Sequence, residues 1–196
     1  MIIPIVAYGD PVLKKKAQKI EKTYPDLSEL IASMFETMYA ASGVGLAAPQ
    51  IGKSIRLFIV DTTPFSEDED LNPDEQKALH GFKKVFVNPE ILEETGDEWA
   101  FNEGCLSIPE VREDVFRPER ITIRYQDENF EEHTEQYEGL IARVIQHEYD
   151  HIEGILFTDK LSSLRKRLIK GKLANISKGK IQPDYRMKFP LLKKGR

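Results

Sequence analysis

Residues 139–154 carry the pattern that most constrains how this chain can fold. The stretch has helical periodicity, and its apolar stripe runs through Leu140 and Val144 and continues through His147 and His151. Two histidines therefore take positions that face a protein core. A buried polar ring needs a partner, so this helix must lie where its histidines meet either hydrogen-bonding groups or a metal ion.

The spacing of these histidines favours the metal. One helical turn brings the rings of His147 and His151 to a common point, and Glu148 can reach a water molecule bound there. From this motif alone, two core histidines that are hydrogen-bonded to backbone or carboxylate groups remain the alternative. The other histidines, His80 and His133, lie in highly polar segments and are expected to be exposed.

A catalytic metal site needs at least one more ligand. Downstream of His151 the only acidic residues are Glu153, Asp159 and Asp184, and the third histidine of the metzincin pattern is absent. The sole cysteine, Cys105, is a candidate because a thiolate binds borderline and soft divalent metals well. By itself, a lone cysteine is most often a small apolar filler. With the two histidines it would complete a set of three ligands that leaves a fourth position for water, as in catalytic zinc sites.

Length and composition are those of an ordinary globular chain. The 196 residues are 40% hydrophobic and 31% charged, and we expect one catalytic domain over residues 1–196. The apolar start "MIIPIVAY" is followed by lysines instead of being preceded by them, which does not fit an export signal. A single cysteine suits a reducing compartment, so a cytoplasmic protein with no membrane contact is expected.

Charge is distributed unevenly along the chain. The net charge is −5, but residues 160–196 hold 13 basic residues and one acid, which leaves −17 on the rest. A basic tail at 165–196 predicts a nucleic-acid or ribosomal contact, and a solvated terminal helix and strand explains the same charges about as well. Residues 62–81 are strongly acidic and predict a surface excursion or lid, to which we assign no chemistry.

The periodicity elsewhere predicts an α+β fold, with mixed or antiparallel β-sheets packed around a central metal-binding helix. An amphipathic helix is expected near the N-terminus, at residues 27–39. Strands are expected at residues 55–61, 83–92, 98–103 and 120–126, and a hairpin over 120–138. Several strands before and between two helices argue against a regular βαβ series.

Three segments together resemble the peptide deformylase family. They are "GVGLAAPQ" (43–50), "EGCLS" (103–107) and "QHEYDH" (146–151), and each agrees with the family's motif at every defining position. The resemblance spans about residues 1–160. It implies an enzyme that removes the formyl group from the N-terminal formyl-methionine of nascent polypeptides and releases formate. The tail beyond about residue 165 has no counterpart in this resemblance.

The resemblance also implies the roles of individual residues. The metal ligands would be Cys105, His147 and His151. Glu148 would be the general acid and base, while the side-chain amide of Gln50 and the backbone N–H of Leu106 would donate hydrogen bonds to the oxyanion. For Gln50, capping of the glycine-rich turn is the alternative.

The resemblance also suggests which residues contact the peptide substrate. In the family the glycine-rich segment pairs with the extended peptide, so Gly45 is expected to contact the substrate backbone. An apolar pocket for the methionine side chain is expected from Val44, Leu140 and Val144, with the aliphatic part of Arg143 at its edge. Arg112 either meets the peptide backbone or is a surface residue. Glu103 and Asp150 are candidates for orienting the ligands.

The same reasoning sets the expected cofactor and partners. The family is associated with Fe²⁺ in the cell, and Zn²⁺, Ni²⁺ or Co²⁺ would suit the same ligands. The expected partners are formyl-methionyl nascent peptides and, transiently, a bacterial ribosome. Three rival classes stay open at this point: a metallopeptidase, a protein with a structural zinc ion, and a nucleic-acid-binding protein. Cys105 argues against the first, and the lack of a fourth ligand argues against the second.

Overall fold

The computed structural model describes residues 1–192, and residues 193–196 of the predicted basic tail lie outside it. Five strands form one antiparallel sheet in chain order. They are β2 (Gly45–Ala47), β3 (Leu57–Asp61), β4 (Lys83–Cys105), β5 (Ile108–Gln126) and β6 (Glu132–Glu138). Two short strands, β1 (Ile5–Val6) and β7 (Met187–Lys188), pair in parallel and join the two ends of the chain.

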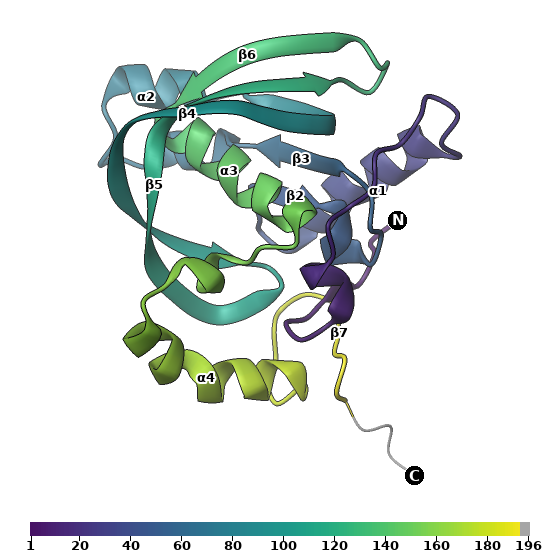
Figure 1. Ribbon diagram of the computed structural model, residues 1–196, viewed down its shortest axis with the longest axis vertical. Coiled ribbons are helices and arrows are strands. Elements are labelled where there is room, and N and C mark those ends of the chain that lie inside the picture. The colour runs from purple at the N-terminus through teal and green to yellow at the C-terminus, as the bar shows by residue number, and fades with distance from the viewer. Residues whose placement is uncertain (193–196) are drawn as a thin grey trace.

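The helices are α1 (Leu27–Ala40), α2 (Pro73–Leu79), α3 (Gly139–Glu153) and α4 (Ser163–Ser177). Helix α3 lies at the centre of the molecule, and strands β4, β5 and β6 curve around it (Figure 1). Its residues contact β2, β3, β5 and β6. The predicted α+β class with antiparallel sheet around the histidine helix is therefore confirmed. Among the described residues, no helix is long and apolar enough to cross a membrane.

Alternate side chains of β5 point toward α3. Ile121, Ile123 and Tyr125 are buried, and they pack with Ala142 and Ile145 of the helix in one apolar cluster. This period of two was the signal for the strand. The predicted hairpin over 120–138 is present as the β5–β6 pair.

One long hairpin replaces several of the predicted strands. The strands expected at 83–92 and 98–103 form a single strand, β4, because local irregularities between them bend the ladder without ending it. Its partner β5 begins at Ile108, twelve residues before the strand that the alternation predicted. The far end of the β4–β5 hairpin lies near α4 (Figure 1). The tip of the hairpin carries Cys105.

The acidic excursion and the basic tail both contain regular structure. In the excursion, α2 begins at a capping box in which Asn72 accepts from the N–H of Glu75 and the Glu75 carboxylate accepts from the N–H of Asn72. In the tail, Ser162 caps α4, which buries Ile169, Leu173 and Ile176 and leaves its basic side chains exposed.

Candidate active site

Two elements bring the three predicted ligands together. Helix α3 supplies His147 and His151 one turn apart, and the tip of the β4–β5 hairpin supplies Cys105. One ligand atom from each of the three residues lies within 4.8 Å of the others, and Sγ of Cys105 is 3.3 Å from Nε2 of His151. A thiolate and two imidazoles in this arrangement fit a single divalent metal ion.

A buried cluster of charged residues holds His147 in place. The Glu103 carboxylate, 4% exposed, lies 2.9 Å from Nδ1 of His147, so Nε2 of that ring is left for the metal. Glu103 also accepts two hydrogen bonds from Arg117 and one from Arg143, and Arg117 reaches Asp150 at 2.7 Å. Burial alone would raise the pKa of Glu103, but the hydrogen bonds from His147 and Arg117 hold it well below its usual range.

The carboxylate of Glu148 has a different environment. Glu148 is 4% exposed, and its Oε2 has no hydrogen-bond partner among the described residues. Burial raises the pKa of Glu148 to about 7. A carboxyl group with a pKa near neutrality can both accept and donate a proton at cellular pH, as a general acid and base must do.

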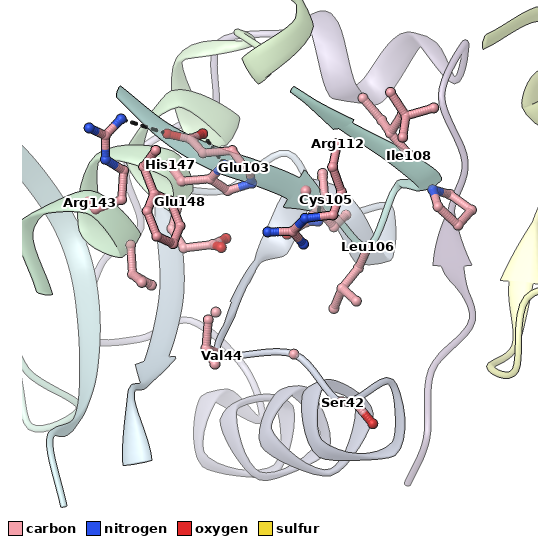
Figure 2. A pocket seen from close by; sticks show the side chains of 18 of the residues that line it. Ser42, Val44, Glu103, Cys105, Leu106, Ile108, Arg112, Arg143, His147 and Glu148 are labelled. Atoms are coloured by element: carbon pink, nitrogen blue, oxygen red, sulfur yellow. Dashed lines mark hydrogen bonds and ion pairs between the residues drawn. The ribbon is translucent and has the colours of Figure 1, made fainter. Parts of the chain in front are cut away.

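A cavity of about 400 Å³ opens beside these groups. Figure 2 shows Cys105 and Leu106 on one wall and Val44 and Ser42 on the facing wall, with the Glu148 carboxylate directed into the space between them. A volume of this order suits a small ligand or the end of a peptide.

Most predicted site residues line this cavity. They are Val44, Gly45, Gln50, Cys105, Leu106, Arg112, Arg143, Val144, His147 and Glu148. His151 is 1% exposed and is not among the lining residues. Leu140 lies one helical turn before Arg143 and Val144 and is not among the lining residues, so its contact with the methionine side chain stays a prediction.

Gln50 is positioned by its own carbonyl group. The Oε1 atom accepts from the N–H of Ala47 at 2.8 Å, which is the turn-capping contact considered for this residue. That contact leaves Nε2 to face Sγ of Cys105 at 3.5 Å and Oγ of Ser107 at 3.4 Å. Capping and donation into the site are therefore compatible.

Gly45 lies against Glu148, and Arg112 contacts Asn102; the sequence predicted neither contact. A Cβ atom at Gly45 would lie 2.8 Å from Cδ of Glu148, so this position must be glycine for Glu148 to keep its place. Arg112 is exposed and donates from Nε to the side chain of Asn102 at 2.9 Å, at the rim of the cavity. The Arg143 guanidinium is 4.4 Å from the ring centre of Trp99 and is held inside the protein.

The sequence reasoning missed three aromatic residues of the cavity, Phe65, Phe101 and Tyr185. Phe65 comes from the acidic excursion at 62–81, so that segment is not only a surface feature, as expected, but also contributes to the site. An aromatic residue between polar and acidic ones was the available signal. Tyr185 comes from the basic tail, and its hydroxyl donates to the carbonyl oxygen of Leu106 at 2.7 Å. No local pattern marks Tyr185.

The fold and these side chains define a class of protein, one with a candidate site for metal-assisted hydrolysis, in which a helix supplies two imidazoles and a glutamate and a hairpin supplies a thiolate. Residues 2–167 match the family described as polypeptide deformylase. Peptide deformylases from Christiangramia forsetii and Flavobacterium johnsoniae are 69% and 65% identical, each over the whole of both chains.

Solved structures agree with the sequence relatives. A crystal structure of a peptide deformylase from Legionella pneumophila is 37% identical with a TM-score of 0.77, over 92% of this chain and 98% of that one. The peptide deformylase of Thermotoga maritima is 39% identical with a TM-score of 0.72, over 83% and 99% of the two chains. The chain therefore belongs to the peptide deformylase family. It is a hydrolase of protein biosynthesis that removes the N-terminal formyl group from nascent peptides.

Proposed function

We propose that Cys105, His147 and His151 hold one metal ion, and that Glu148 moves the proton during deformylation. The observation that carries this proposal is the convergence of the three ligand atoms beside an unpartnered, buried Glu148 oxygen. When bound, a divalent ion supplies Lewis acidity at this point. Among possible ions we propose Fe²⁺ in the cell, with Zn²⁺, Ni²⁺ or Co²⁺ as replacements, because the ligand types suit all four.

The side chains around the ligands would then carry out the rest of the reaction. Water adds to the formyl carbon as Glu148 accepts its proton, and the same carboxyl group returns the proton to the nitrogen when the C–N bond breaks. The side-chain amide of Gln50 and the N–H of Leu106 donate hydrogen bonds to the oxygen that becomes negative. The products are formate and the free amino terminus.

Substrate selection would come from the walls of the cavity. Val44 and Val144 offer apolar surface for the methionine side chain, and Gly45 allows the peptide backbone to approach closely. A formyl group carries hydrogen where an acetyl group carries a methyl group, so a site this close to the ligands can distinguish the two acyl groups by size.

The test is release of formate from a formyl-methionyl tripeptide by protein purified without oxygen, with the acetyl-methionyl peptide as control. We expect rapid release from the first and none from the second. Cys105→Ser and Glu148→Gln variants then separate the two proposed roles: the first should lose bound metal, and the second should keep the metal and lose activity. Equal activity of all three proteins would refute the assignment.

We further propose that the enzyme acts in the cytoplasm as one catalytic domain over residues 1–196 and docks transiently on the ribosome through α4. The exposed cations Lys166, Arg167 and Lys170 on this helix support the docking, because clustered positive charge attracts nucleic acid. Replacing these three residues with glutamate should abolish co-sedimentation with ribosomes and leave tripeptide hydrolysis unchanged. Unchanged co-sedimentation would refute the docking.

A further inference from the structure

The connection between β4 and β5 is a two-residue turn, but its residues are not those that such turns favour. Cys105 pairs with Ile108, so only Leu106 and Ser107 form the turn. The favoured two-residue turns between antiparallel strands need positive φ angles, which Asn and Gly adopt most readily. Neither Leu106 nor Ser107 is among the described residues with positive φ. This turn therefore depends on contacts from outside the hairpin for its shape.

Three distant segments supply those contacts. The N–H of Tyr8 donates to the carbonyl oxygen of Ser107 at 2.8 Å, and the Gln50 amide faces the Ser107 hydroxyl at 3.4 Å. The Tyr185 hydroxyl donates to the carbonyl oxygen of Leu106 at 2.7 Å. Of the three, the Tyr185 contact is the one made to Leu106 itself.

The ends of the chain hold Tyr185 in position. Two residues after it, β7 begins, and Met187 pairs with Ile5 of β1, whose N–H donates to the carbonyl oxygen of Arg186 at 2.9 Å. The Tyr185 ring is half-buried against an apolar cluster that includes Leu106. Burial raises the pKa of Tyr185, so its hydroxyl keeps the proton that it donates. Tyr185 lies outside residues 2–167, the part that matches the family.

We propose that Tyr185 is a positioning residue for deformylation, whose hydroxyl fixes the Leu106 carbonyl and so aims the neighbouring Leu106 N–H at the developing oxyanion. This inference rests on the proposed role of Leu106 as an oxyanion donor. A donor helps the reaction only when it is already in place as the charge forms, and a turn without its own preferred geometry needs such a fixing contact. The C-terminal segment thus completes a site that the family motifs alone leave loosely held.

The experiment compares Tyr185→Phe with Tyr39→Phe. Both lose a tyrosine hydroxyl that donates a short hydrogen bond, but the partner of Tyr39 is Asp61, outside the cavity. We measure kcat and KM for the formyl-methionyl tripeptide, bound metal and Tm. Tyr185→Phe should lower kcat about fivefold, equivalent to about 1 kcal/mol, with unchanged KM and metal content. Tyr39→Phe should keep the wild-type kcat. Tyr185→Leu, a second variant without the hydroxyl, should lose at least as much kcat.

Two results would overturn the proposal. One is a kcat of Tyr185→Phe within twofold of the wild type. The other is a loss of activity explained by lost metal, or by a fall in Tm clearly larger than that of Tyr39→Phe, since either would make the role structural. Gln50→Ala, which removes the other proposed donor, is measured in parallel. If Gln50→Ala loses kcat and Tyr185→Phe does not, only the inference about Tyr185 fails. If neither loses kcat, the proposed oxyanion site itself fails.

Discussion

Replacing Glu103 by glutamine should destabilise the protein far more than an ordinary loss of one ion pair. The Glu103 carboxylate is 4% exposed and lies between Arg117, Arg143 and His147. Of these three, only Arg117 also pairs with Asp150. Without the negative charge, Arg117 keeps only Asp150 as a carboxylate partner, and Arg143 keeps only the backbone carbonyls of Val115 and Trp99. Removing one partner of a buried ion pair costs about 3–5 kcal/mol, and the glutamine amide would also direct N–H groups at arginine donors.

Urea unfolding of metal-free protein measures this cost directly. Glu90→Gln is the matched control, because Glu90 pairs with Arg124 at 2.7 Å but both side chains are about half exposed. The control should change the free energy of unfolding far less, because water screens an exposed ion pair. In a metal titration, Glu103→Gln should also bind metal about 10–100-fold more weakly, because Nδ1 of His147 loses its charged acceptor and can meet at best a neutral amide oxygen. A Glu103→Gln protein as stable as the control would refute the reasoning.

Three further changes test other contacts. Gly45→Ala should reduce kcat on the order of 10²-fold with bound metal unchanged, because its Cβ would displace Glu148, and steady-state kinetics with unchanged kcat would contradict this. Glu148→Gln should lower kcat by about 10²–10⁴-fold, and metal analysis should find the ion still bound; lost metal would point to a ligand role instead. Burial and the hydrogen bond to Asp61 raise the pKa of Tyr39 from 10.0 to about 12. This raised pKa adds stability below pH 10 that is lost as the pH rises through 12, so the stability difference between wild type and Tyr39→Phe should shrink over that range in pH-dependent unfolding, and a constant difference would contradict it.

The parts of the site that could be predicted depend on local geometry. His147, Glu148 and His151 lie on one helix, and the i,i+4 spacing brings the two rings together whatever surrounds them. Cys105 was found because so few other ligands were available and because its segment resembles a family motif. The central helix and the β5–β6 hairpin followed from periods of 3.6 and 2 in the same direct way.

The parts that could not be predicted depend on strand register and on contacts between chain ends. Arg117 and Glu103 come from the neighbouring strands β5 and β4, and the register that pairs these strands is not visible in the sequence. Tyr185 reaches Leu106 only because β7 pairs with β1, near the other end of the chain. Phe65 lines the cavity from a segment whose acidic composition predicts a surface excursion or lid, and nothing in that composition singles out this residue.

The two halves of the site are held by different kinds of interaction, and this difference should separate their mutants. Glu103 is held by charge-assisted hydrogen bonds inside the protein, which are strong and costly to break. The turn at Leu106 and Ser107 is held mainly by neutral hydrogen bonds, each worth about 1 kcal/mol. Changes around Glu103 should therefore alter stability and metal affinity together. Changes around the turn should alter kcat alone, because they move a donor without removing a charge or a ligand.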